Sequence, residues 1–394
     1  MGKVGTEATL LNILGVTSAI ARKTAISTMA DFKGMINDGV ASLICPVGTQ
    51  FGLKFKRTSA ATAIDMPFDI VHYDSDGAYL KSHYAGPEAI QFDAPEAIYY
   101  TGNGGLAAGT YHIDIGSAYG NGWDTSKSIQ FTLANALEED DQIYIECGTD
   151  NKNDPTNGRT LTVYAKGSTT AKETTTTSNG TGGTSLGTIG ATSAQKPEGQ
   201  LNAISRVVYG SGRWSQSAIR QYLNSAAAAG SWWTAQNGWD RPPAQHSTVY
   251  GFMAGMDQEL LDVIDTVDVV TALNTVEGYQ DTYETTQDKF FLPSLQEMYI
   301  NPQLANTEGV DWDYYKQLAS EAGLSGKFQQ GQTYPILIGY DAASPTSPVY
   351  VRLRSAYRGY ATIAWFVYSS GNVNNSNASN AYRGWAACKI KKKS

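Results

Sequence analysis

Short strand-like runs, divided by turn residues, fill residues 43–166 and limit what this part of the chain can fold into. Each run is too short for a stable helix, and its β-branched and aromatic residues favour an extended backbone. Runs at this spacing are typical of a β-sandwich or a similar sheet domain. The runs are Leu53–Phe55, Phe68–Tyr73, Ala89–Phe92, Ile98–Tyr100, Thr110–Ile115, Ser128–Leu133, Gln142–Glu146 and Thr160–Tyr164.

Residues 6–38 have a different pattern, with apolar side chains at near-helical spacing and no proline. This pattern predicts a helix that either packs on its own domain or associates with copies of itself or a larger assembly. We therefore assign residues 1–42 to an N-terminal helical attachment or oligomerisation segment. No stretch reaches the roughly 18 unbroken apolar residues of a membrane span, so we expect no membrane insertion.

Residues 167–199 are rich in Thr, Ser and Gly, which bury little apolar surface, and we expect a linker or an exposed hairpin there. Seven of the eight Trp follow this stretch, so residues 200–394 should form a domain with its own aromatic core. Helical and strand-like patterns alternate with long loops in it, which predicts an α+β domain. The expected helices lie within Ser215–Ala229, Asp257–Ile264 and Ser294–Ile300, and the expected strands are Tyr334–Ile338, Val349–Leu353, Ala364–Tyr368 and Ala386–Ile390.

Charge and motif content exclude several function classes. The net charge is −8, and nucleic-acid binding needs a basic face, so we expect no nucleic-acid partner. The three cysteines (Cys45, Cys147 and Cys388) are far apart and form no CxxC pair, and the four histidines match no hydrolase motif. The acidic run 138–141 favours a charged turn over a calcium loop. We expect no enzymatic activity, cofactor or metal.

The window from Ser355 to Gly384 is the most informative part of the chain. Its only charged residues are Arg358 and Arg383, in a protein of which 17% is charged. It also holds five Asn and six aromatic residues. Antibody combining loops use the same residue types, because Tyr gives wide contact with few torsions to freeze and Asn and Ser give adaptable hydrogen bonds. A binding surface is favoured over a turn between core strands.

Short blocks around this window carry a specific resemblance. The blocks are Arg352–Ala356, Ala364–Val367, Ser370–Val373 and Ala386–Ile390, with Tyr209–Ser211, Ser217–Asn224, Trp232–Trp233 and Phe291–Ser294 upstream. They resemble the variable proteins of diversity-generating retroelements, and the resemblance covers about residues 200–394. It implies a C-type lectin fold of the formylglycine-generating-enzyme-like branch. The segments Ile44–Thr49 and Gln91–Glu96 are similar to virion-associated proteins of tailed phages of gut bacteria.

The resemblance also implies which positions vary. Adenine randomisation of Asn codons in this family excludes Lys, Glu, Gln, Met and Trp, and only Trp365 in the window falls outside the reachable set. Trp365 is therefore expected to be a buried scaffold residue. The ligand-binding positions are expected to be Tyr357, Tyr360, Thr362, Ile363, Phe366, Tyr368, Asn372, Asn374, Asn375, Asn377, Asn380 and Tyr382. The family often ends in a Gly-Val-Arg-Pro-Ala-like strand, whereas this chain has Arg383–Cys388, which leaves the end of the variable region open near Trp385.

The expected function is that of a virion-associated protein of a phage tail or head fibre, which displays a hypervariable surface for host adhesion. The resemblance implies a host cell-surface protein or glycan as ligand, a homotrimeric state by analogy with phage fibres, and attachment to other virion proteins through the N-terminal region. Calcium-lectin signatures are absent, so calcium-dependent sugar binding is not expected. Two alternatives remain: a bacterial surface adhesin of the same fold, and an enzyme of the formylglycine-generating type.

Overall fold

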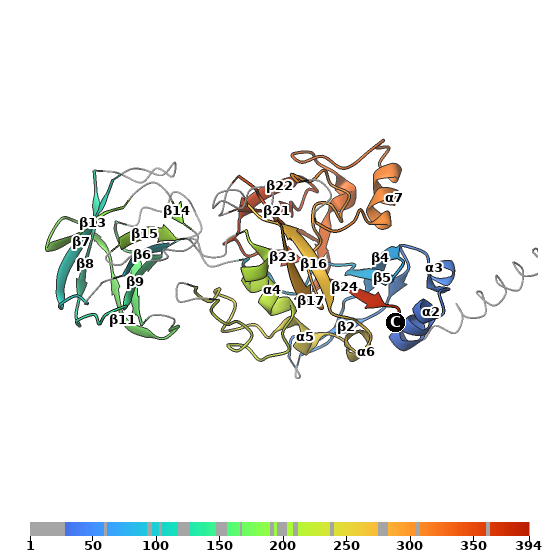
Figure 1. Ribbon diagram of the computed structural model, residues 1–394, viewed down its shortest axis with the longest axis horizontal. Helices are drawn as coiled ribbons and strands as arrows, with labels where there is room; N and C mark the ends of the chain where they lie inside the picture. The colour runs from blue at the N-terminus through green and yellow to red at the C-terminus, as the bar shows by residue number, and fades with distance from the viewer. Residues whose placement is uncertain are drawn as a thin grey trace, which may run out of the picture.

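The chain forms two bodies, a smaller one whose described elements are all strands and a larger one that holds both strands and helices (Figure 1). Together they are mostly β with few helices. The computed structural model describes residues 28–58, 61–92, 97–101, 105–116, 126–146, 156–165, 168–189, 193–194, 203–207, 212–236, 240–274, 283–304, 308–359 and 363–393.

The smaller body is a β-sandwich of two sheets that share one core. Inward positions alternate along each strand, so Ile113 and Phe131 from one sheet meet Ile143, Leu161 and Val163 from the other. One sheet has the order β11-β10-β9-β6-β15-β14 and the other β12-β8-β7-β13. The strands are β6 (Ala97–Thr101), β7 (Gly109–Ile115), β8 (Ser128–Leu133), β9 (Gln142–Glu146), β10 (Thr160–Tyr164), β11 (Ala171–Thr176), β12 (Ser178–Asn179), β13 (Thr184–Ile189), β14 (Ser193–Ala194) and β15 (Ala203–Val207).

The predicted strands between residues 98 and 164 are confirmed. Of the two alternatives expected at residues 167–199, a linker or an exposed hairpin, the described residues form exposed strands and not a linker. Described parts of that stretch form β11 to β14, and β11 pairs with β10 along its whole length. Its Thr-rich side chains are largely exposed. Main-chain hydrogen bonds need no apolar side chain, so a polar sequence can form an outer strand of a sheet.

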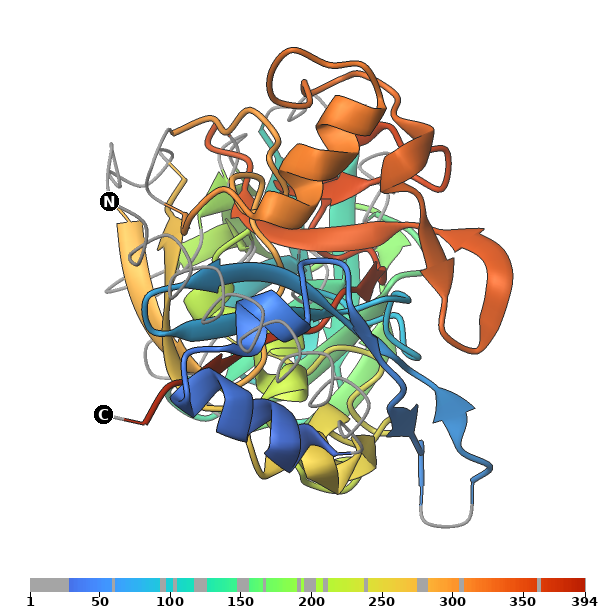
Figure 2. The same cartoon turned by 90° about the vertical axis from the view of Figure 1, so that its right-hand side faces the viewer.

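The larger body holds a separate core. Its main sheet has the order β1-β4-β5-β24, and a second sheet has the order β22-β21-β20-β23. Figure 2 shows α2 and α7 at opposite sides of this body, with β4 and β5 between them. Its strands are β1 (Gln50–Phe51), β2 (Lys54–Phe55), β3 (Ile64–Asp65), β4 (Phe68–Asp74), β5 (Gly77–Ser82), β16 (Val267–Ala272), β17 (Tyr283–Asp288), β18 (Gly339–Asp341), β19 (Ser344–Val349), β20 (Val351–Ala356), β21 (Ile363–Val367), β22 (Val373–Asn377), β23 (Arg383–Gly384) and β24 (Ala387–Lys391).

The helices of the larger body are short. They are α2 (Met29–Asn37), α3 (Ala41–Ile44), α4 (Ala218–Leu223), α5 (Phe252–Gly255), α6 (Gln258–Leu261) and α7 (Asp313–Glu321), with 3₁₀ turns η1 (Trp214–Gln216) and η2 (Pro335–Leu337). Three expectations are wrong here: residues 294–300 form turns instead of a helix, the strand expected at Tyr334–Ile338 is η2, and Ala89–Phe92 has only an isolated bridge at Ile90 in place of a strand. Within the described ranges, no helix combines the length and apolar character needed to cross a membrane.

The pairing of β5 with β24 corrects the predicted domain boundaries. Leu80 lies opposite Cys388, so described residues up to 92 share a sheet and a core with the C-terminal part. The sandwich at 97–207 is therefore inserted into the larger body and does not precede it. The predicted divisions at 43–166 and 200–394 followed sequence order, which carries no signal for a pairing between strands so far apart along the chain.

The N-terminal helix α2 belongs to the same core. Thr28 and Asp31 form a capping box at its start, in which each side chain accepts a hydrogen bond from the other residue's backbone N–H. Its buried residues, including Phe32 and Ile36, pack into the larger body. In the described part, the helix thus packs on its own domain, which was one of the two alternatives; residues 1–27 of the expected attachment segment lie outside the described residues.

A buried arginine contacts the sandwich from the larger body. Arg241 donates from Nη2 to Oε1 of Gln142 at 2.6 Å, and its guanidinium lies 4.2 Å from the centre of the Tyr164 ring. Gln142 is the first residue of β9 and Tyr164 the last of β10, so the contact links one end of these paired strands to Arg241.

Candidate functional site

The window 355–384 lies on the sheet β22-β21-β20-β23, and the pairing of its strands sets which side chains share a face. Trp365 pairs with Asn375, and the next residue, Phe366, pairs with Asn374. Because successive residues of a strand point to opposite faces, Trp365 and Phe366 face opposite ways. Trp365 belongs to the main core and is 3% exposed, as expected of a scaffold residue.

Four aromatic rings cluster on the face of Phe366. Tyr350 contacts the other three at close to right angles, with ring centres 5.9 Å from Phe366, 5.2 Å from Tyr368 and 5.3 Å from Tyr382. Phe366 stacks on Tyr382 at 4.9 Å. Edge-to-face and offset contacts of this kind are the favoured geometries for aromatic pairs. The three tyrosines cover Phe366, which is fully buried.

A hollow of about 340 Å³ opens beside these rings. Tyr350, which is 40% exposed, and Tyr382 form part of its wall. Arg383 also lines it and is held by Asp341 at 2.7 Å and by the Gly86 carbonyl at 2.8 Å. The complete lining is Ala89, Pro348, Val349, Tyr350, Ser369, Ala381, Tyr382 and Arg383.

Arg352 lies buried beneath the cluster. Its guanidinium carbon is 4.6 Å from the centre of the Tyr382 ring and 5.8 Å from that of Phe366, within cation–π range. It is fully buried, and burial lowers the pKa of its guanidinium to about 10, which keeps it charged at neutral pH. No carboxylate of the described residues pairs with Arg352, whose acceptors are backbone carbonyls.

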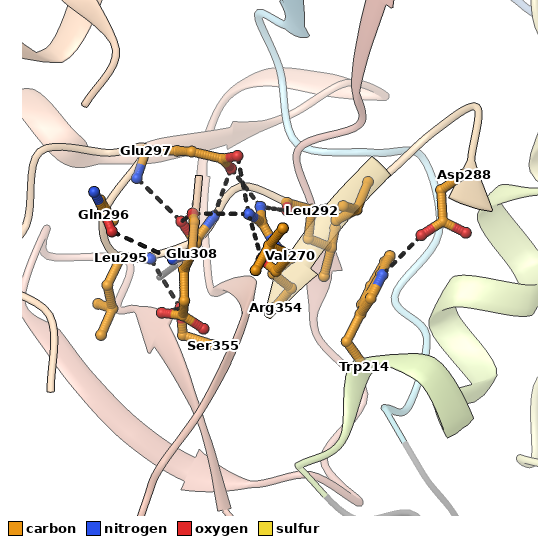
Figure 3. A network of polar contacts seen from close by, with 12 residues as sticks. Trp214, Val270, Asp288, Leu292, Leu295, Gln296, Glu297, Glu308, Arg354 and Ser355 are labelled. Carbon is orange, nitrogen blue, oxygen red and sulfur yellow. Dashed lines mark hydrogen bonds and ion pairs between the residues drawn. The ribbon is translucent and has the colours of Figure 1, made fainter. Parts of the chain in front are cut away.

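Arg354, two residues along the same strand, is bound differently (Figure 3). It forms a buried, two-pronged ion pair with Glu297, with Nη2 2.9 Å from Oε1, and donates to the Leu292 carbonyl at 2.7 Å. Glu308 accepts from the Ser355 hydroxyl at 2.7 Å, and burial raises the pKa of the Glu308 carboxyl. This network connects β20 to the loops at 292–297 and 308, so it supports the sheet, and none of its residues lines the hollow.

The predicted binding residues divide between the two faces. Phe366, Tyr368, Asn374, Asn380 and Tyr382 lie together on the Phe366 face, and of these five only Tyr382 lines the hollow. Asn380 donates from Nδ2 to Oγ of Ser376 at 2.9 Å and to the Tyr382 hydroxyl at 3.3 Å. Asn374 donates to Oδ1 of Asn372 at 3.2 Å. These side chains are half-buried and hydrogen-bond mainly to one another.

The remaining described members lie on the Trp365 side or at its edge. The Tyr357 ring is 5.4 Å from that of Trp365, and strand pairing places Asn375 and Asn377 opposite Trp365 and Ile363. Asn372 is tied to the Gly331 carbonyl at 3.1 Å. Tyr360 and Thr362 lie outside the described residues.

Phe366 corrects one expectation and two further residues were missed. Phe366 was expected among the contact residues, yet Tyr350 and the two window tyrosines cover it completely. Tyr350 and Arg352 precede the window and were not predicted as site residues. The sequence did hold a sign of them: just before the window, Tyr350 and Arg352 alternate with the apolar residues Val351 and Leu353. Trp385 is buried at 4% exposure, which places it with the core and not with the displayed window.

Other candidate chemistry is not assembled into a site. Cys388 is fully buried and burial raises the pKa of its thiol, an environment typical of an unreactive cysteine. Cys45 is also buried, and Cys147 lies outside the described residues. Across the described ranges, His, Cys, Asp and Glu form no group of three or more that could hold a metal ion.

Comparison with known proteins gives one match. Residues 198–391 match the family model of DUF6273, a domain of unknown function. No curated protein and no solved structure matches the chain. The matched range includes the whole window and β24 but stops short of β5, the strand with which β24 pairs.

Proposed function

We propose that the protein is a virion-associated receptor-binding protein, whose C-terminal part has a C-type lectin fold and displays a hypervariable surface for host adhesion. The ligand is a host cell-surface protein or glycan, and the chain acts as a homotrimer attached to other virion proteins through its N-terminal region. The observation that carries the proposal is the contact of Tyr350 with Tyr368 and Tyr382, together with the open hollow that Tyr350 and Tyr382 line.

The residue types at this hollow suit adaptable recognition. Tyrosines supply broad contact with little entropy loss, and the half-exposed hydroxyl of Ser369 in the lining can both donate and accept a hydrogen bond. Arg383, already oriented by Asp341, adds a fixed cationic group to the wall. Aromatic and arginine side chains in such a setting are the residues that most often dominate binding energy.

The binding experiment compares matched tyrosines. Fluorescently labelled protein is incubated with a panel of gut bacterial cells and scored by flow cytometry. Y350S should lower binding at least tenfold to any strain that the native protein stains. Y250S is the control, because Tyr250 is 39% exposed, much as Tyr350 is, and lies outside the site. Equal loss of binding in the two variants, or binding unaffected by Y350S, would refute the proposed surface.

The genomic experiment addresses variation. DNA adjacent to the gene should hold a near-copy of the codons for residues 355–384, differing chiefly at adenines and beside a reverse transcriptase gene. Absence of such a copy would remove the hypervariable part of the proposal and leave a fixed adhesive surface.

A further inference from the structure

We propose that Arg352 is a positioning residue that holds the backbone of the binding window from outside it, so that side chains there can change without changing its shape. This inference rests on the proposed function, because only a surface that varies needs such an arrangement. The supporting observation is that the hydrogen bonds from Arg352 to the window are accepted by main-chain carbonyls.

Arg352 donates to four carbonyls of the window. Nη1 donates to the carbonyls of Ala364 at 3.0 Å and Ser376 at 3.3 Å. Nη2 donates to those of Asn377 at 2.8 Å and Asn380 at 3.3 Å. One planar guanidinium therefore ties β21, β22 and the turn after β22 together, all through main-chain atoms.

Two further carbonyls of the window, those of Ala378 and Ser379, accept hydrogen bonds from the segment that leads into the sandwich. The Phe92 backbone N–H donates to the Ala378 carbonyl at 2.9 Å, and Nε2 of Gln91 donates to the Ser379 carbonyl at 2.7 Å. With Arg352, these two residues take five consecutive carbonyls, those of residues 376–380. We call this set of bonds the carbonyl clamp.

The carbonyl clamp does not depend on which side chains the window carries. Every donor is outside 355–384 and every acceptor is a carbonyl oxygen, which any amino acid provides. The side chains of Asn377 and Asn380 can thus be exchanged while their carbonyls stay bound. A charged group buried against carbonyls alone is costly to maintain, whereas Arg354 on the same strand has Glu297 as its counter-ion.

The role needs arginine and not merely a cation. A guanidinium presents five N–H donors in a fixed planar fork, whereas a lysine ammonium has three donors on one atom and cannot span the same acceptors. The rings of Tyr382 and Phe366 cover the guanidinium and exclude water from the bonds. We therefore expect those two positions to keep an aromatic ring, and positions 374, 375, 377 and 380 to accept most residues.

The first experiment measures tolerance to substitution. Codons for Asn374, Asn375, Asn377 and Asn380 are randomised in three displayed full-length backgrounds: native, R352K and I36A. Ile36 is buried in α2, outside the window, so I36A leaves a cavity in the core and supplies a destabilised control, and the Tm of both parent proteins is measured beside the libraries. The readout is the fraction of library members that resist protease.

For each library, the protease-resistant fraction is divided by that of its unmutated parent. This ratio should be similar for the native and I36A libraries, and at least tenfold lower for the R352K library. Equal loss in R352K and I36A would show that Arg352 contributes only general stability. A native library in which fewer than about one member in a hundred resists protease would equally overturn the proposal.

A second experiment does not require any Arg352 variant to fold. Hydrogen exchange is followed in the native protein and in the quadruple variant N374S/N375S/N377S/N380S. Exchange protection across residues 363–382 should stay within twofold, because the carbonyl clamp is intact; a loss of tenfold or more would contradict it. Neither experiment uses a ligand, so a failure to bind host cells refutes the proposed function alone, and a failure here refutes only the clamp.

Discussion

Leu80 of β5 and Cys388 of β24 lie opposite each other in one antiparallel sheet, although the whole inserted sandwich separates them along the chain. The pairing makes the last strand of the protein dependent on a strand near its start. Ile390 and Ala387, both fully buried, complete the same core as Phe68 and Leu80.

A fragment limited to residues 198–391 is therefore predicted not to fold. Without β5, the β24 backbone loses its hydrogen-bond partners and its apolar face is exposed to water. Proton NMR dispersion and thermal melting by circular dichroism would test this, and a cooperative melt of the isolated fragment would contradict it.

Replacement of residues 93–211 by a short Gly-Ser linker is predicted to leave the larger body folded. Its two flanking segments are already adjacent, because the Ala218 N–H donates to the Phe92 carbonyl at 2.8 Å. The sandwich has a separate apolar core, so removing it leaves the larger body's core complete. Melting of the shortened protein as one cooperative unit would support the insertion; an unfolded product would show that the Arg241 contact is essential.

F366A is predicted to destabilise the protein by about 3–5 kcal/mol, because it leaves a cavity at a fully buried ring. Y350S, at a ring that is 40% exposed, should cost about 1 kcal/mol or less. Urea unfolding followed by tryptophan fluorescence gives both values. Similar losses in the two variants would show that Tyr350 is as much a core residue as Phe366.

E297L is predicted to lower the free energy of unfolding by about 3–5 kcal/mol, because it leaves the Arg354 guanidinium buried without its counter-ion. The control is D65N, which removes the partner of Lys54 in an ion pair whose side chains are 59% and 73% exposed. Such surface pairs contribute about 0–1 kcal/mol. A small effect of E297L in the same urea experiment would mean that Arg354 finds other partners.

Asp240 is predicted to make the protein less stable as pH rises toward neutrality. Burial raises the pKa of its carboxyl from 3.8 to about 7, so folding favours the protonated form. The stabilisation is complete below about pH 4 and is lost as pH rises through 7, by roughly 2–3 kcal/mol between pH 5 and pH 7. The difference in unfolding free energy between the native protein and D240N isolates this contribution, and a difference that is flat with pH would refute it.

Elements of this protein that depend on interactions between near neighbours in the chain were predicted better than those that depend on distant residues. Strands such as Ser128–Leu133 and Gln142–Glu146 were predicted with their observed bounds, because alternation and turn residues are local signals. The burial of Trp365 was also predicted, because the resemblance implies that tryptophan cannot occupy a variable position. By contrast β5, α7 and the hairpin β16–β17 were missed, although Tyr315 and Ala319 of α7 are buried at helical spacing and burial largely alternates along β16 and β17.

The sequence by itself determined which residues form the window and its unusual composition. Only the tertiary structure decided that the window divides between two faces, that Phe366 is covered, and that Arg352 reaches four of its carbonyls. The reason is physical: composition and period depend on neighbours along the chain. The bonds from Arg352 and the pairing of Leu80 with Cys388 depend on which distant strands share a sheet.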